Sequence, residues 1–363
     1  MRIAVVSQVP PPVHGSTVMT QEFLAALTRL GHSAVLVDRR FSADVASIGK
    51  PSIRKVLSGL SLAWRAFRTA CKEKPDCAVL FLTNRPASFL SDLLVLWVLR
   101  MNRVPVVHYV HTVGFRRLAA RGGAWQRAVR LALGSAEAIV CLGPSLAADV
   151  LPWADPERVR SIGNLTSATR PSDVKRAGVR LAFMSNLLPE KGAREYVAMA
   201  VALADKFPDV AFTLAGAAGD AGYFDLLARD IEASGLGDRL EYLGQVRGDD
   251  RWHHLASASA LVFPSSYEFE AQPLTIIEAL SVGTSVVAFD VGGIRDLDSD
   301  TAAAGVAALH LVTESSVGAL VRVVGALLNR YSESAWPDIG AERFGAERYD
   351  TEWQNVLSSV GDR

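Results

Sequence analysis

The sequence has little of several features that would point to particular classes of protein. It holds only 3 cysteines in 363 residues. Cys71, Cys77 and Cys141 have neither paired nor metal-ligand spacing, so we expect reduced, buried thiols and no disulfide framework. The longest apolar run, 89–99, is interrupted by Asp92, and the opening Met-Arg-Ile-Ala-Val-Val is too short for a signal peptide. These shortages predict a cytoplasmic protein without a membrane-spanning segment.

The loop after the first predicted strand lacks the glycines of a dinucleotide-binding site. Residues 8–16 read QVPPPVHGS, with one glycine where GxGxxG would be required, so an NAD enzyme is disfavoured. Gly15 would still let the backbone approach a phosphate or sugar, and Ser16 or Thr17 could cap the next helix. A capped turn without a ligand explains the same residues equally well.

Charge is unevenly distributed along a chain of ordinary composition. Half of the residues are apolar and 21% are charged, and the length suits two domains. The formal net charge of zero combines residues 1–170, with 22 Lys+Arg against 10 Asp+Glu, and residues 171–363, with 16 against 28. The N-terminal half is therefore about +12 and is expected to meet a negatively charged partner.

Short β-rich runs alternate with helical periodicity, which predicts an α/β fold with parallel sheets. Strands are expected at 3–7, 34–37, 78–83, 104–110 and 138–142, with a helix over 18–30, and the pattern restarts at 180–184, 211–215, 240–243, 260–263 and 285–289. A polar stretch of sequence around 164–178 separates the two series of predicted strands. We therefore expect two Rossmann-like domains facing a central cleft: an acceptor domain (1–165), a linker (166–178), a donor domain (179–335) and closing helices that pack across both (336–363).

Ligands of open α/β sheets bind where strands end, so unusual residues in the loops after the strands are candidates for a site. His111 ends a hydrophobic strand and could donate or accept a hydrogen bond in a cleft. His108 lies on the opposite face of that strand and is expected to be structural. A lone histidine of either kind is weak evidence for a site.

Two loops of the second domain also qualify. Residues 185–192 read SNLLPEKG, where Lys191 could neutralise a diphosphate and Gly192 would allow close approach, although an isolated surface lysine is the commoner explanation. Residues 243–246 read LGQV, where Val246 could seat a flat base. Nothing else distinguishes this second loop from an ordinary strand end.

The segment FPSSYEFEAQPLTIIEAL, 263–280, contains the strongest signal. A strand is followed by a helix whose first turn is expected at Pro273, so the N–H groups near Gln272 and Leu274 would lie at its positive end and attract phosphate. Glu270 and Glu278 flank this start and can accept hydrogen bonds from sugar hydroxyls. Two solvated glutamates are the common alternative, but Glu278 is embedded among apolar residues.

This segment, read on to Gly293, resembles the E-x7-E region of retaining glycosyltransferase family four, which has the two-domain glycosyltransferase B fold. The Gly15 loop, His111, AIVCLGPSLAADVL, SNLLPEKG and LEYLGQV extend the resemblance along nearly the whole chain. No single motif is specific, but the set is. The resemblance implies a retaining hexosyltransferase that usually needs no metal or other cofactor.

Roles follow from the resemblance residue by residue. It implies that Glu278 binds the nucleotide ribose, Glu270 a donor-sugar hydroxyl and Lys191 the diphosphate, with His111 near the reacting carbon and the Gly15 backbone on the phosphate side. Two positions depart from the family. Asn186 stands where an arginine is common, which removes one phosphate charge, and Pro273 replaces a glycine, which removes one N–H donor.

A metal-dependent alternative rests on the aspartates of 296–300. Asp296, Asp298 and Asp300 could hold Mg²⁺ on a diphosphate, as paired aspartates do in the other major glycosyltransferase fold. They follow the Gly292-Gly293 loop, where a solvated helix start is the commoner reading. A metal is therefore not expected.

The acceptor side is suggested by two basic, tryptophan-bearing helical stretches, 54–72 and 114–130. Each could be an ordinary amphipathic helix packed on the sheet. Together with the +12 half they favour docking on an anionic cytoplasmic membrane surface and a lipid-linked acceptor. No nucleic-acid recognition module is found.

The sequence thus predicts a cytoplasmic, peripherally membrane-bound enzyme of polysaccharide biosynthesis. It would move a sugar from a UDP- or GDP-linked donor to a hydroxyl of a cell-envelope glycan or lipid-linked saccharide. Three alternatives remain: a soluble glycosyltransferase acting on a small metabolite, a sugar-nucleotide epimerase and a sugar-nucleotide-binding regulatory module.

Overall fold

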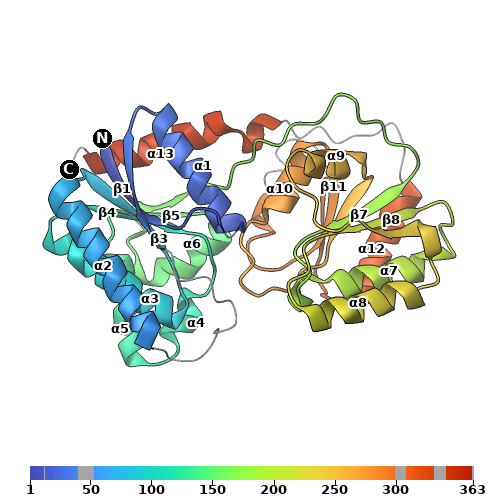
Figure 1. Cartoon of the computed structure of the whole chain (residues 1–363), viewed down its shortest axis with the longest axis horizontal. Coiled ribbons are helices and arrows are strands. Elements are labelled where there is room, and N and C mark those ends of the chain that lie inside the picture. The colour runs from blue at the N-terminus through green and yellow to red at the C-terminus, as the bar shows by residue number, and fades with distance from the viewer. Residues whose placement is uncertain (12, 40–52, 299–307, 331–340, 362–363) are drawn as a thin grey trace. The chain divides into compact units, whose positions relative to one another are not determined.

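The computed structural model describes residues 1–11, 13–39, 53–298, 308–330 and 341–361. Contacts divide the chain into two compact units (Figure 1). Unit 1 comprises Met1–Leu165 and Ala346–Arg363, and unit 2 comprises Thr166–Gly345. The expected linker, 166–178, groups with unit 2, and most of the expected closing segment groups with unit 1.

Unit 1 is a six-stranded, wholly parallel sheet in the order β2-β1-β3-β4-β5-β6. Its strands are β1 (Arg2–Ser7), β2 (Ser33–Asp38), β3 (Cys77–Leu82), β4 (Val106–Val110), β5 (Ala138–Cys141) and β6 (Val159–Ser161). Its helices are α1 (Gly15–Arg29), α2 (Ile53–Glu73), α3 (Pro86–Met101), α4 (Phe115–Ala119), α5 (Gly123–Gly134), α6 (Pro144–Val150), η2 (Leu151–Trp153), η3 (Pro156–Arg158) and α13 (Ala346–Gly361).

Unit 2 is a second six-stranded parallel sheet, in the order β12-β11-β10-β7-β8-β9. Its strands are β7 (Arg180–Met184), β8 (Ala211–Ala215), β9 (Leu240–Tyr242), β10 (Ala260–Phe263), β11 (Ser285–Phe289) and β12 (Leu309–Val312). Its helices are η4 (Pro189–Lys191), α7 (Ala193–Ala204), α8 (Ala221–Ala233), η5 (Gly237–Arg239), α9 (Asp250–Ser257), α10 (Leu274–Ser281), α12 (Val317–Arg330) and η6 (Ala341–Phe344).

The expectation of two α/β units with parallel sheets is confirmed. Central strands are buried on both faces, as β3 and β4 are along their whole length, which is why they read as continuous apolar runs. The expected strand list omitted β6 and β12. Both are short edge strands with partly exposed residues, so neither carries a long apolar run.

Helix α13 completes the core of unit 1. Trp353 is fully buried against Phe23 of α1, with ring centroids 4.4 Å apart, and the hydroxyl groups of Tyr349 and Tyr109 lie 3.1 Å apart. Arg29 forms two hydrogen bonds with the Asp350 carboxylate, at 2.7 and 2.8 Å. Figure 1 shows α13 running beside α1.

The structure corrects two expectations, one about the burial of the cysteines and one about the basic stretch 114–130. Cys71 is exposed on α2, whereas Cys77 and Cys141 are buried, and all three thiols are free. The basic stretch 114–130 is not one helix, because α4 ends at Ala119 and α5 begins at Gly123. Among the described helices, none combines the length and the apolar content needed to cross a bilayer.

Candidate functional site

The strand order of unit 2 identifies the point on its sheet where a ligand would bind. The first strand of the unit, β7, lies between β8 and β10, so the connection from β7 to β8 and the connection from β10 to β11 run in opposite directions across the sheet. At such a switch point the loops after the two central strands separate and leave a crevice. The loop after β7 carries Lys191, and the loop after β10 carries Glu270.

Lys191 and Glu270 contact each other directly. Lys191 Nζ lies 2.5 Å from Glu270 Oε2, and their side chains are only 17% and 10% exposed. The fully buried Ser265 donates a second hydrogen bond to the same carboxylate oxygen, at 2.8 Å. The backbone N–H of Ser266 bonds the carbonyl of Glu190 at 2.9 Å, which ties the two loops together.

Aromatic rings border the Lys191 ammonium group. Its Nζ lies 4.8 Å from the centroid of the Tyr267 ring and 5.9 Å from that of Phe263. The electron-rich faces of such rings stabilise a cation at this range. The ammonium group is therefore held in one position by a carboxylate and two rings.

Two glycines let the backbone close tightly around this pair. Gly192 has φ +81°, and a Cβ there would lie 2.1 Å from the carbonyl oxygen of Pro264. Gly292 has φ +59°, and a Cβ there would lie 1.9 Å from the carbonyl oxygen of Glu270. The Gly293 N–H donates to that same Glu270 carbonyl at 3.1 Å. Only glycine satisfies both the conformation and the space at 192 and 292.

Glu278 forms a separate ion pair in the second turn of α10. It is 5% exposed, and its Oε1 lies 3.1 Å from Nη1 of Arg251 on α9. Burial raises the pKa of Glu278 above its usual value, and the charge of Arg251 opposes that shift. The carboxylate is thus a buried acceptor whose counter-ion is already present.

The start of α10 differs by one position from the expectation. Pro273 is the N-cap residue, with φ −62° and ψ 122°, and Leu274 is the first helical residue. The first intrahelical bonds run from the N–H groups of Ile276 and Ile277 to the Pro273 carbonyl. The N–H groups of Leu274 and Thr275 therefore precede the helical ladder. Gln272 is buried just before them.

The remaining expected residues of unit 2 lie at the same end of the sheet. Asn186 is exposed in the loop after β7, so its amide is accessible, although it carries no charge to replace an arginine. Val246 is partly buried and packs against the core cluster that contains Ile277. Asp300, one of the aspartates considered for a metal, lies outside the described residues. Within the described residues, no group of three or more His, Cys, Asp or Glu side chains has a metal-binding arrangement.

In unit 1, the loop after β1 leads into α1 through an ordered cap. His14 is the N-cap residue, and the Thr17 hydroxyl accepts its N–H at 3.0 Å as one half of a capping box, whereas Ser16 Oγ lies 3.1 Å from the His14 ring. Gly15 is the first helical residue, and a Cβ there would meet no atom within 4 Å. Packing within the protein therefore does not require glycine at 15.

His111 follows β4 and lies among aromatic rings. Its ring is parallel to that of Phe81, with centroids 5.0 Å apart, and 4.0 Å from that of Tyr109. Burial lowers the pKa of His111 to about 3, so the imidazole is neutral near pH 7. Its Nε2 is buried without a hydrogen-bond partner among the described residues. A neutral His111 can hydrogen-bond a hydroxyl but supplies no positive charge.

His108 is a structural residue, as predicted from its place on the opposite face of β4 from His111. It is fully buried, and its Nε2 lies 3.0 Å from the carbonyl oxygen of Ala132, so Nε2 carries the proton. Two residues that the sequence analysis missed complete the unit 2 site: Ser265, which binds Glu270, and Arg251, which pairs with Glu278. Ser265 lies two residues after β10, and that position was the signal available for it.

Chemically, the unit 2 site offers one fixed ammonium group, backbone N–H groups at a helix start and two buried carboxylates. The first two favour a negatively charged group, and carboxylates accept hydrogen bonds from hydroxyls. A ligand with both phosphate and hydroxyl groups would satisfy all of them.

Two family models match adjoining parts of this chain. The family model of glycosyl transferases group 1 matches residues 171–335, and that of Glycosyltransferase Family 4 matches residues 13–170. A 2-deoxystreptamine N-acetyl-D-glucosaminyltransferase of Streptomyces fradiae is 28% identical over 235 residues, covering 62% of this chain and 51% of that protein. An alpha-maltose-1-phosphate synthase of Mycolicibacterium smegmatis is 30% identical over 202 residues, covering 47% and 48%. The matches thus span about half the length of these two relatives.

Solved structures share the fold over nearly the whole chain. The Anabaena protein HepE in complex with UDP superposes with a TM-score of 0.73 at 18% identity, covering 99% of this chain and 100% of that one. A sucrose-phosphate synthase from Thermosynechococcus elongatus gives a TM-score of 0.70 at 16% identity, covering 99% and 97%. These likenesses show the two-domain glycosyltransferase B fold. The two adjoining family models support a glycosyltransferase of the group 1 and family 4 type.

Proposed function

We propose that the protein is a retaining glycosyltransferase that moves a hexosyl group from a UDP- or GDP-linked sugar to a hydroxyl of a cell-envelope glycan or lipid-linked saccharide. The observation that carries this proposal is the Lys191–Glu270 pair at the switch point of the unit 2 sheet. UDP is the first nucleotide to test, since it is the ligand named for the structurally similar HepE.

The pair suggests how the donor would be held. A diphosphate would compete with Glu270 for the Lys191 ammonium group, and a donor-sugar hydroxyl would take the place of Lys191 on the carboxylate. Glu278 would accept a ribose hydroxyl. His111, neutral at physiological pH, would contribute a hydrogen bond to the sugar.

In the transfer step, the bond between the anomeric carbon and the diphosphate oxygen breaks, and the acceptor oxygen bonds to the same face of that carbon. The acceptor proton passes to an oxygen of the departing diphosphate. Lys191 and the N–H groups at the start of α10 stabilise the charge that develops there. The scheme needs no side-chain nucleophile and no metal.

A membrane-associated acceptor is supported by an apolar surface on unit 1, which we call the α2/α3 face. Eight large apolar side chains on these two helices are exposed by 39–67%: Leu57, Leu60, Trp64, Phe67, Leu90, Leu94, Trp97 and Met101. In each helix they recur at spacings of three and four, so each set forms one stripe. Contiguous exposed apolar surface of this kind marks an interaction site.

The two helices that carry the stripes pack against each other. A Cβ on Gly59 of α2 would lie 2.8 Å from Ser91 Oγ of α3, and Cys71 Sγ lies 3.4 Å from Asn102 Oδ1. The exposed Arg68, Lys72 and Arg100 follow the apolar residues along the helices. We propose that the α2/α3 face rests on anionic lipid and makes the enzyme peripheral on the inner face of the membrane.

A small-metabolite acceptor is the second candidate. The name of the first relative given above specifies 2-deoxystreptamine as the molecule that is glycosylated, and the name of the second specifies maltose 1-phosphate as the product. Activity on a small acceptor without lipid would favour this candidate. Consumption of the sugar nucleotide with no acceptor present would instead indicate an epimerase.

Thermal-shift measurements with UDP, GDP, ADP and dTDP, with and without Mg²⁺, test the donor part. One diphosphate should raise the melting temperature of the wild type, and Glu278→Ala should abolish that increase. Arg229→Ala, an exposed change on α8, is the matched control and should keep it. Equal stabilisation of Glu278→Ala and the wild type would refute the ribose assignment.

A further inference from the structure

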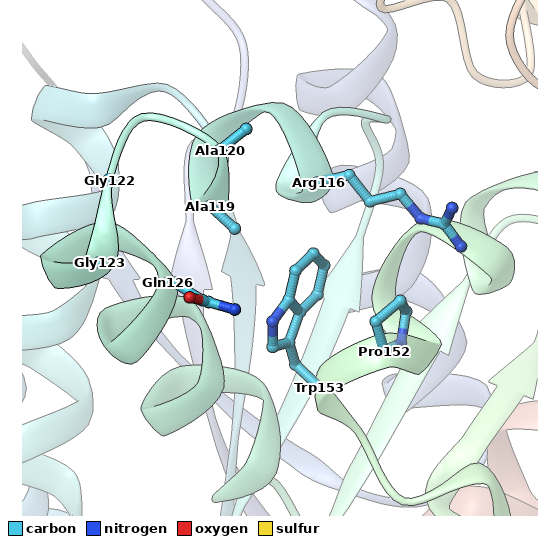
Figure 2. Close-up of a pocket in the computed structure, with 8 residues that line it drawn as sticks. All are labelled: Arg116, Ala119, Ala120, Gly122, Gly123, Gln126, Pro152 and Trp153. Carbon is cyan, nitrogen blue, oxygen red and sulfur yellow. The ribbon is translucent and has the colours of Figure 1, made fainter.

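Unit 1 contains a pocket that none of the expected site residues line. It has a volume of about 540 Å³ and lies between α4, the start of α5 and η2. Figure 2 shows the Trp153 indole standing between the side chains of Gln126 and Arg116, with Ala119 above it. The remaining lining residues are Ala120, Gly122, Gly123 and Pro152.

The wall that carries Arg116 is held in place by hydrogen bonds. The Asp149 carboxylate accepts the N–H groups of Gly114, Phe115 and Arg116 at 2.7–3.0 Å, which anchors the start of α4. The Arg116 guanidinium donates from Nη2 to the Ala148 carbonyl at 2.7 Å, so its remaining N–H groups have a defined direction. Such a preformed surface loses little conformational entropy on binding.

The glycines keep the pocket open. A Cβ on Gly122 or on Gly123 would meet no atom within 4 Å. At Gly122 the backbone itself favours glycine, because φ is +142°. At Gly123 no positive φ and no close contact requires glycine, so a larger side chain could be placed there and would extend into open space at the pocket.

The lining chemistry matches a sugar ring. The flat indole of Trp153 can cover the C–H face of a pyranose, Gln126 can both donate to and accept from hydroxyls, and Arg116 donates only. Among the described residues, no carboxylate lines the pocket. The arrangement therefore suits a ring with one apolar face and oxygen atoms at its edge, and it favours a negatively charged substituent on that ring.

We propose that this pocket binds one sugar residue of the acceptor glycan, away from the sugar that reacts. The inference rests on the proposed function for its acceptor. Arg116 follows His111 by five residues, so one short segment of unit 1 carries both the expected reaction-side histidine and this pocket. The pocket would then select acceptors by a saccharide unit that is not itself glycosylated.

Binding to an array of defined neutral and uronic-acid oligosaccharides tests the pocket without turnover. The wild type should bind a subset of glycans. Trp153→Leu, which removes the indole, and Gly123→Leu, which fills the open space, should each bind that subset at least about tenfold more weakly, a loss of about 1.4 kcal/mol. Leu131→Ala, an exposed change on α5 outside the pocket, is the matched control.

The controls separate this proposal from the donor proposal. Lys191→Ala should bind the array like the wild type, and Gly123→Leu should keep its melting temperature and its stabilisation by the nucleotide. Absence of glycan binding by the wild type, or equal binding by both pocket variants, would overturn the pocket assignment. If no nucleoside diphosphate raised the melting temperature of the wild type, the donor assignment would be overturned instead.

Discussion

At the residue scale, the unit 2 site depends on one partly buried cation, Lys191. Lys191 is neutralised by Glu270 in the absence of ligand, and Ser265 and Tyr267 fix the positions of both groups. A diphosphate with two negative charges is a stronger partner for the ammonium group than one carboxylate. The pair is therefore suited to exchange partners when a donor binds.

Replacing Lys191 by methionine should lower kcat by about 10²–10³-fold, because the charge facing the leaving group is lost. Lys191→Arg should lower kcat less, since arginine keeps the positive charge but carries it on a planar guanidinium group instead of an ammonium group. Steady-state kinetics at saturating donor measure the effect. Lys206→Met, an exposed change on unit 2, is the control, and a wild-type kcat for Lys191→Met would contradict the proposed role.

His108 should make the stability of the protein dependent on pH. Burial lowers its pKa to about 4, whereas an unfolded chain titrates near 6.5. Between these values the unfolded state binds the proton and the folded state does not, so stability falls as pH decreases from 6.5 to 4. The slope from this residue is at most about 1.4 kcal/mol per pH unit.

Urea unfolding across this pH range measures the contribution. His108→Gln keeps an N–H donor for the Ala132 carbonyl but does not titrate, so its stability should fall less steeply towards pH 4. The two proteins should have parallel profiles above pH 7.5. Identical slopes between pH 6.5 and 4 would show that His108 does not carry the shift.

At the scale of elements, α2 and α3 each have one side in the core and one on the surface. In α2 the fully or nearly buried Leu62 and Ala66 face the sheet, while Trp64 and Phe67 stack on each other at the surface, with centroids 5.6 Å apart. In α3 both sides are apolar. The Phe89–Leu99 run therefore reads as a core helix, although Leu90, Leu94 and Trp97 are exposed.

The α2/α3 face should bind anionic vesicles in preference to neutral ones. Trp64→Gln combined with Trp97→Gln removes two side chains that are each 63% exposed, and it should weaken co-sedimentation with phosphatidylglycerol vesicles at least about tenfold. Raising the salt concentration should weaken the wild type as well, because the basic side chains contribute.

Leu226→Gln on α8 is the matched control, since it replaces an exposed apolar residue of unit 2. It should co-sediment like the wild type. Equal binding of the wild type to phosphatidylcholine and phosphatidylglycerol vesicles would rule out an electrostatic membrane contact.

At the scale of the whole molecule, the chain returns to its first unit at the end. Helix α13 is the last described element, yet its Tyr349 and Trp353 are buried with Tyr109 and Phe23 of unit 1. Tyr109 also contacts the ring of His111, so this helix supports the residues around the expected reaction-side histidine. The integrity of unit 1 therefore depends on residues more than 300 positions away from its first strand.

Trp353→Ala should destabilise unit 1 by about 4 kcal/mol, as expected for removal of a fully buried large aromatic side chain. Calorimetry should resolve an earlier transition for unit 1 while that of unit 2 keeps its temperature. Val201→Ala, an exposed change on α7, should leave both transitions unchanged. A single transition that shifts as a whole would indicate that the two units unfold together.

The sequence by itself determined the two α/β units, nearly all of the parallel strands and the loops that carry the site. Buried strands need long apolar runs, and the ends of parallel strands fall on one edge of the sheet. The strands and the loops that carry the site can therefore both be predicted from short stretches of sequence. It also singled out Lys191 and Glu270, although they are 79 residues apart, because each follows a central strand.

Only the tertiary structure decided which of these groups touch. The pairing of Arg251 with Glu278 and the close approach of Gly292 to Glu270 each join segments that no short-range pattern connects. The orientation of α3 was also decided only by the tertiary structure, because apolar residues on both sides of this helix do not indicate which side faces water. Packing against the sheet and against α2 settles that, because it fills one side and leaves Trp97 and Met101 exposed.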